Sequence, residues 1–240
     1  MLAVKISYFL LSATCLLLIY FAFNLGLKKA FSEPSEIKKT RLWVVTIVVV
    51  WIIIISIGSI SGFFSDFDSI PPKVALGLVP PMVILLIWTI KSKKLKVLLG
   101  KIPVHWIIGF QSFRVIVEIM LWKQYDLGIT PIQMTFEGRN FDILVGLTAP
   151  IMAYLYWKKG DIMRNLAIIW NFIGLGLLLN VIVVAILSFP TPFRYFMNEP
   201  SNEAITTFPF ILLPALLVTM AYTMHYFSLK QLLTKGIHKG

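Results

Sequence analysis

The chain has 240 residues, of which 58% are hydrophobic and 14% are charged, and its mean hydropathy is +0.84. Soluble domains are roughly 45–50% apolar, so this composition argues against an ordinary soluble protein. The 22 Lys and Arg outnumber the 11 Asp and Glu, which gives a formal net charge of +11.

The apolar residues are gathered in long blocks. A helix needs about 18 or more apolar residues to span roughly 30 Å of hydrocarbon. Hydropathy and the positions of Pro and Gly predict seven such helices; their ranges are 4–26, 42–64, 73–90, 102–122, 141–157, 165–188 and 207–229. The connections are too short for a soluble domain, so residues 1–240 are expected to form a single transmembrane domain, an all-α membrane bundle of seven helices.

The first segment is expected to be a retained helix and not a signal peptide. Its apolar stretch, Ile6 to Leu27, is longer than the roughly 7–15 residues of a signal peptide's apolar region, and Lys28 and Lys29 follow it. Because Cys15 is the single cysteine, neither an intramolecular disulfide nor a cysteine-based metal site is expected.

The basic residues lie mostly on one side of the predicted bundle. Sixteen of the 22 Lys and Arg fall in the connections 27–41, 91–101 and 158–164 and in the tail after residue 229. Short loops rich in Lys and Arg stay in the cytoplasm, which predicts an N-terminus outside, a C-terminus inside and a location in the cytoplasmic (plasma) membrane. Contact with anionic headgroups explains the positive charge, so the expected partner is the lipid bilayer and not nucleic acid.

The third segment contains Pro80 and Pro81 near its middle. Proline removes a backbone donor and clashes with the preceding turn, so a kink or break is expected here. Such a break marks either a binding site, where freed carbonyls line a cavity, or an ordinary kinked helix of a bundle.

The fourth segment carries polar residues at membrane depth. Gln111, Arg114 and Glu118 are spaced i, i+3 and i+7, so they share one helix face, in the outer half of the bilayer. Arg114 and Glu118 are i, i+4 neighbours and can pair. Each charge costs at least about 2.5–3.5 kcal/mol at the bilayer centre. The residues therefore indicate either a buried pair that locks the helix to its neighbours, or a ligand, ion or proton site.

Residues 134–142, MTFEGRNFD, add polar side chains between the fourth and fifth segments. Asn140 suits an N-cap, and Asp142 suits the first turn of the helix that follows. Glu137 and Arg139 are expected beside that helix N-terminus, at the same membrane face as Arg114.

Together these residues predict an outward-facing vestibule between the fourth and fifth segments. Two arginines and free backbone N–H groups favour a small anionic ligand, whereas the acids favour a cation or proton, so the sign of a small polar ligand stays open. The candidate ligand-binding residues are Gln111, Arg114, Glu118, Glu137, Arg139, Asn140 and Asp142.

Motifs of several enzyme classes are missing. The sequence has no HExxH, GxSxG, Walker or GxGxxG motif. His105 and His225 are expected at similar depth, where two histidines can hold a haem or a metal, but no third ligand is apparent. We therefore expect no cofactor and no metal. The last segment has no lysine before Lys230, which argues against a retinal-based pump.

The run from Phe113 to Pro150, which contains FRVIVEIMLW and GITPIQMTFEGRNFDILVGLTAP, resembles a signature of uncharacterised bacterial multi-pass membrane proteins. The resemblance implies a small integral membrane protein of unassigned activity and assigns no role to any residue.

Three functions are compatible with the sequence. The first is binding or translocation of a small polar solute or ion at the outer-half site. The second is an intramembrane enzyme for a lipid or lipid-linked substrate, with Glu118 or Glu137 as the acid/base. The third is a structural or assembly subunit whose charges hold helices together. Whether the protein is an enzyme, and its oligomeric state, stay open.

Overall fold

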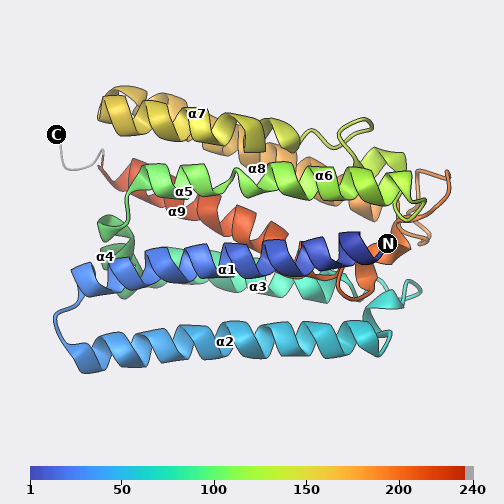
Figure 1. Cartoon of the computed structure of the whole chain (residues 1–240), viewed down its shortest axis with the longest axis horizontal. Helices are drawn as coiled ribbons and strands as arrows, with labels where there is room; N and C mark the ends of the chain where they lie inside the picture. Colours follow the sequence, from blue (N-terminus) through green and yellow to red (C-terminus); the bar gives the residue numbers. More distant parts are fainter. Residues whose placement is uncertain (236–240) are drawn as a thin grey trace.

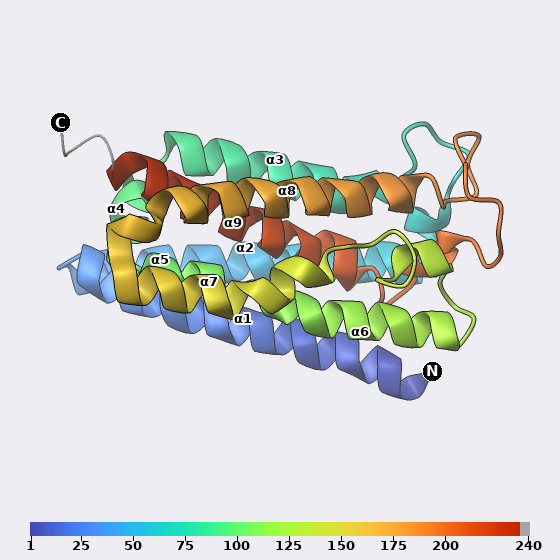
Figure 2. The ribbon, with the colours of Figure 1, turned by 90° about the horizontal axis from the view of Figure 1, so that it is seen from above.

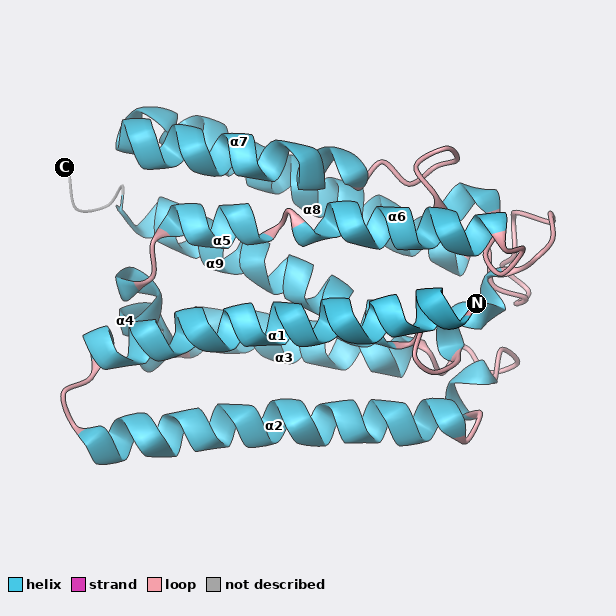
Figure 3. Ribbon diagram, in the orientation of Figure 1, coloured by secondary structure: helices cyan, strands magenta, loops and turns pink. Residues whose placement is uncertain are grey.

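The computed structural model describes residues 1–235, which are all-α (Figure 3). The elements in chain order are α1 (Leu2–Ala30), α2 (Pro34–Ile60), η1 (Phe63–Ser65), α3 (Ala75–Lys91), α4 (Lys93–Lys101), α5 (Val104–Phe110), α6 (Phe113–Asp126), η2 (Ile132–Met134), α7 (Ile143–Lys159), η3 (Gly160–Met163), α8 (Arg164–Ile186), η4 (Asn202–Thr206), the π-helix η5 (Leu213–Val218) and α9 (Thr219–Lys235).

The long helices lie side by side along one axis (Figures 1 and 2). The start of α1 and the connections α2–α3, α6–α7 and α8–η5 lie at one end of the bundle, here called the loop end. The α1–α2 connection, α4, η3 and the end of α9 lie at the opposite end, here called the lysine-rich end.

Four helical segments of residues 1–235 are long and apolar enough to cross a membrane, or five if the bent pair α3–α4 is one span. They are α1, α2, α5 with α6, and the 44-residue stretch Ile143–Ile186, which contains α7, η3 and α8. Many large apolar side chains on these helices are exposed, Leu10, Leu17 and Ile53 among them. These candidate spans indicate a membrane location.

All seven predicted segments lie on helices, but two of them are interrupted. The fourth consists of α5 and α6, which meet at Gln111 and Ser112. There the Ser112 hydroxyl donates to Gly109 O at 2.7 Å and its N–H donates to the same carbonyl at 3.1 Å. The seventh begins as the π-helix η5 and continues as α9.

Of the kink or break expected at Pro80 and Pro81, the break is not observed: α3 continues through both prolines to Lys91. They lie in the first two turns, so the roughly three turns that follow keep their hydrogen bonds and hold the helix together. The chain bends instead by 86° between α3 and α4. Ser92 lies at this bend and its hydroxyl oxygen accepts the N–H of Leu95, which caps α4.

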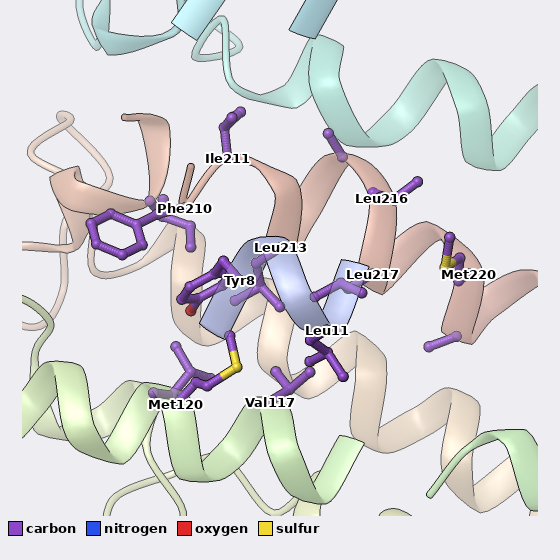
Figure 4. Packing of buried hydrophobic residues seen from close by; sticks show 14 of the residues in the cluster. Tyr8, Leu11, Val117, Met120, Phe210, Ile211, Leu213, Leu216, Leu217 and Met220 are labelled. Atoms are coloured by element: carbon purple, nitrogen blue, oxygen red, sulfur yellow. The ribbon is translucent and has the colours of Figure 1, made fainter. Parts of the chain in front are cut away.

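The helix formed by η5 and α9 is buried along almost its whole length. The start of η5 packs in the main apolar cluster with Tyr8 and Leu11 of α1 and Val117 and Met120 of α6 (Figure 4). Further along, α9 contacts α3, α5 and α8. Its polar side chains, including Thr223, His225 and Ser228, are also buried, so they need partners inside the protein.

Candidate functional site

Arg114 is the centre of a buried polar network. It is the largest fully buried side chain of the described residues, with 2% of its surface exposed. Its Nε donates to Oδ2 of Asp142 at 2.6 Å, and its Nη2 donates to Oδ1 of the same carboxylate. Its Nη1 lies 3.0 Å from Nε2 of His225. Three guanidinium nitrogens are therefore bonded to two side chains from α7's start and from α9.

The hydrogen bonds also define the tautomer of His225, that is, which ring nitrogen carries the proton. The amide nitrogen of Asn171 donates to Ala167 O at 2.7 Å and to the Ser228 hydroxyl at 3.0 Å. The amide oxygen of Asn171 therefore faces Nδ1 of His225, 2.8 Å away, and Nδ1 must carry the proton. Nε2 then accepts from Arg114, so the network holds a neutral imidazole.

Glu118 lies one turn beyond Arg114 on α6 and is 1% exposed. Its Oε1 accepts a hydrogen bond from the amide of Asn140 at 2.9 Å, whereas its Oε2 has no hydrogen-bond partner among the described residues. The i, i+4 ion pair with Arg114 is not formed. Arg114 pairs with Asp142 instead, because a carboxylate that offers both oxygens to the guanidinium edge makes the stronger, bidentate contact.

Asn140 connects the 134–142 loop to both flanking helices. It is fully buried, and its amide nitrogen donates to Met134 O at 3.0 Å as well as to Glu118. Its amide oxygen accepts the N–H of Asp142 at 3.0 Å, two residues on, as an N-cap side chain does. The helix itself starts at Ile143, with Asp142 at the N-cap position.

Glycine 138 makes this loop possible. The N–H groups of Gly138 and Asn140 both donate to Thr135 O, at 3.0 and 3.1 Å. A β-carbon at Gly138 would lie 2.6 Å from the Cα of Gln133 and would also meet the carbonyl oxygen of Ile132. The tight backbone turn therefore requires glycine, and it orients Asn140 toward α6.

The structure buries five of the seven candidate residues and leaves two outside. Gln111 joins the buried set at the α5–α6 junction, where its amide nitrogen donates to Ala221 O of α9 at 3.0 Å. Glu137 and Arg139 are exposed. The guanidinium of Arg139 lies 5.4 Å from the ring centre of Phe196, and its side chain lines a surface groove. The buried cluster and Arg139 are thus separate places.

Two buried residues that contact this set, Asn171 and Tyr8, were not predicted from the sequence. Asn171 stands alone in the apolar run AIIWNFIGL of α8, and this isolation is the signal that indicates a buried partner. Tyr8 of α1 is fully buried, and its hydroxyl points toward α6 beside Met120 (Figure 4). It interacts there electrostatically with Glu118. No local pattern in the first segment indicates that contact.

His105 and His225, which the sequence places at similar depth, have different surroundings. His105 lies beside Trp106 and Trp157, with ring centres 6.4 and 6.5 Å away, whereas His225 bonds to Arg114 and Asn171. Residues 1–235 contain no group of three or more His, Cys, Asp or Glu side chains that could hold a metal ion.

Comparison with known proteins identifies one family that matches the chain. No curated protein and no solved structure matches the chain. Residues 71–233, about two thirds of the chain, match the model of a domain of unknown function, DUF8737. All members of the Arg114 network lie within the match, whereas α1 and α2 precede it. The chain belongs to the DUF8737 family.

Proposed function

We propose that this protein binds, and translocates across the membrane, a small cation or hydrogen-bond donor, as small as a proton, at Glu118. One observation supports this most directly: Oε2 of Glu118 is buried and has no hydrogen-bond partner among the described residues. A buried polar atom without a partner costs free energy. A ligand that donates a hydrogen bond or carries positive charge removes that cost.

The choice of a cation or donor follows from how Arg114 is occupied. Its Nε, Nη1 and Nη2 already bond to Asp142 and His225. An anion would have to displace the carboxylate of Asp142, which is itself buried. The binding capacity left among the buried candidate residues is that of acceptors, Oε2 of Glu118 and the amide oxygen of Gln111, and Glu118 is the one that can carry a negative charge.

Further buried polar atoms of α1 and α6 have no hydrogen-bond partner in the described part of the chain. They include the Tyr8 hydroxyl, the Ser12 hydroxyl one turn along α1, and the amide nitrogen of Gln124. The Tyr8 hydroxyl also interacts electrostatically with Glu118. A small polar ligand or a short chain of water molecules between α1 and α6 would satisfy these groups. Ionisable groups inside a membrane bundle are by default functional candidates.

Cation flux into vesicles tests the proposal. The full chain would be reconstituted into vesicles, and a membrane potential would drive protons, ammonium, sodium or potassium in separate assays, with a pH-sensitive dye inside the vesicles for the first two ions and a sodium- or potassium-sensitive dye for the others. We expect flux of at least one of these ions in the wild type and its loss in Glu118→Gln. Glu137→Gln, which removes an exposed carboxylate from the same region, should behave like the wild type. Flux that survives Glu118→Gln, or a wild type that moves none of the four, would refute the proposal.

A structural role is the second candidate, supported by the bonds that all three guanidinium nitrogens of Arg114 make to Asp142 and His225. In that reading the Arg114–Asp142 pair joins α6 to α7 and no ligand binds. It predicts that neither the wild type nor Glu118→Gln moves any of the four ions, while Arg114 variants lose stability. The enzyme reading has less support, because Glu137 is exposed and only Glu118 is buried as a candidate acid.

The proposed setting is one transmembrane domain of seven spans, with the N-terminus outside and the C-terminus in the cytoplasm. Most lysines lie in α4 and in the last or first turns of the helices that meet at the lysine-rich end, an end that Figure 1 shows. This favours a cytoplasmic position for that end. In a Cys15→Ser background, a membrane-impermeant maleimide added to intact cells should label Asp68→Cys at the loop end and not Ser32→Cys. Both positions are exposed. The reverse labelling would invert the orientation.

A further inference from the structure

A second candidate site lies on the surface of the loop end, apart from the buried cluster. It is a groove of about 530 Å³ between the 134–142 loop, the last turns of α8 and the segment 195–196. Arg139 lines it at one position, and Phe141, Val183 and Leu187 supply apolar walls. Phe141 and Val183 are 49% and 45% exposed, so an apolar ligand can reach them.

The charge of Arg139 is available to a ligand. In residues 1–235 its guanidinium forms no ion pair, and it lies against the ring of Phe196. Arg194, in the neighbouring connection, is different: it donates to Phe196 O, to Asn198 O and to Oε1 of Glu199. A guanidinium presents a planar set of donors that matches phosphate oxygens. Arg139 is therefore suited to a phosphate group, whereas Arg194 is already bonded.

The groove also lies beside the end of one helix of the bundle, α8. Arg139 precedes the start of α7 by four residues, and Val183 and Leu187 flank the end of α8 at Ile186. In a membrane-spanning bundle, helix ends lie at headgroup depth and their last apolar turns lie at acyl-chain depth. The groove thus places a cation and apolar walls together near one helix end, and these suit the charged and the apolar part of a phospholipid.

We propose that this groove binds one anionic phospholipid, with its phosphate on Arg139 and an acyl chain along Phe141, Val183 and Leu187. The site is independent of Glu118. The lipid phosphate supplies the negative charge with which Arg139 can pair. The acyl chain covers apolar surface that a free phosphate would leave exposed. A site of this kind selects lipids by headgroup charge.

Native mass spectrometry of the full chain in neutral detergent tests this, with dioleoylphosphatidylglycerol as the probe and dioleoylphosphatidylcholine as the uncharged comparison. We expect one phosphatidylglycerol bound to the wild type and apparent affinity lowered about fivefold in Arg139→Gln. Lys123→Gln removes another exposed charge, close to the same loop end, and should bind like the wild type. Val183→Glu places a negative charge in the groove without touching Arg139, and should also weaken binding.

Three outcomes would overturn the proposal. The first is equal loss of binding in Arg139→Gln and Lys123→Gln, which would mean general charge attraction. The second is equal binding of the two lipids. The third is inorganic phosphate that competes at millimolar concentration through Arg139, which would mean a free-anion site. If Arg139→Gln does not fold, Val183→Glu decides: wild-type binding of phosphatidylglycerol in that variant would also reject the site.

Discussion

Arg114 of α6 and Asp142 at the start of α7 form a bidentate ion pair that is closed to solvent, with side chains 2% and 7% exposed. The pair joins the helix before the 134–142 loop to the helix after it. Removing two charges from water costs several kcal/mol per ion, which is recovered only when geometry is good and the remaining donors are bonded. Here the remaining Nη1 of Arg114 is bonded to His225.

Breaking this pair from one side should destabilise the protein strongly. We expect Arg114→Leu and Asp142→Leu each to lower the free energy of unfolding by about 3–5 kcal/mol, because each leaves a lone buried charge. The double variant should lose less than the sum of the two, since it leaves neither charge. Unfolding in mixed micelles, analysed as a double-mutant cycle, measures the coupling.

Lys123→Ala is the control for this cycle. It breaks the exposed pair with Asp126, whose side chains are 52% and 40% exposed, and exposed pairs contribute about 0–1 kcal/mol. Single variants at Arg114 and Asp142 that cost no more than Lys123→Ala would show that solvent reaches the pair in the membrane.

Two glycines of α8 provide a matched test of the His225 position. A β-carbon at Gly174 would lie 2.6 Å from Nε2 of His225, whereas a β-carbon at Gly176 would meet nothing within 4 Å. Gly174→Ala should therefore displace the imidazole from Arg114 and lower stability by about 1–3 kcal/mol, the usual cost of overpacking. Gly176→Ala should be neutral or stabilising by up to about 1 kcal/mol, because alanine favours helix more than glycine does.

Thermal unfolding of both glycine variants in the same detergent checks this expectation. If Gly174→Ala is as stable as Gly176→Ala, α8 does not pack against the imidazole as closely as the structure shows, and the Arg114–His225 bond would need another explanation.

A pH effect is expected outside the spans, at Asp66 in the α2–α3 connection. Lys73 Nζ lies 2.6 Å from Oδ2 of Asp66. This hydrogen bond, more than the backbone N–H groups of Asp68 and Ser69, lowers the pKa of Asp66 below its ordinary value of 3.8. Because the folded pKa is the lower one, the contribution to stability is complete above pH 3.8 and is lost as pH falls through the folded pKa.

The comparison of two variants isolates this effect. The melting temperature of the wild type should fall more between pH 5 and pH 3 than that of Asp66→Asn or Lys73→Met, in which the interaction is absent. The difference should be small, because both side chains are about one third exposed. Equal slopes in all three proteins would mean that the ion pair does not form in solution.

The helices and the polar face of the fourth segment could be predicted from sequence, and for a clear reason. Bilayer thickness sets a length that apolar runs must match, and burial of three polar residues at i, i+3 and i+7 is a local pattern. Gln111, Arg114 and Glu118 are all buried, as one helix face requires, although Gln111 lies at the α5–α6 junction.

The side chains to which Arg114 and Glu118 bond could not be predicted from the sequence, because these bonds join distant parts of the chain. Arg114 is 28 residues from Asp142 and 111 residues from His225, while the near neighbour Glu118 turns to Asn140. Likewise, Arg139 and Asn140 are adjacent in sequence, yet one is exposed and the other fully buried. The backbone turn at Gly138 decides between them, and residue type alone does not report it.

That turn leads to the last prediction, for Gly138→Ala. The atoms that a new β-carbon would meet belong to the backbone of Ile132 and Gln133, so no side-chain rotation can relieve the clash and the loop must open. Asn140 would then lose its bond to Met134 O and its hold on Glu118. We expect a loss of at least about 2 kcal/mol in stability, together with the same loss of cation flux as in Glu118→Gln.

Gly100→Ala separates this effect from glycine replacement in general. A β-carbon there meets nothing within 4 Å, and the residue lies inside α4, so stability should be kept or slightly increased. If Gly138→Ala instead keeps wild-type stability but loses flux, the loop acts on a ligand directly and does not act by positioning Asn140. If the loop acts by positioning Asn140, Asn140→Ala should lose flux; if the loop acts on a ligand directly, Asn140→Ala should keep flux. Measuring Gly138→Ala and Asn140→Ala in one vesicle assay decides between these two roles.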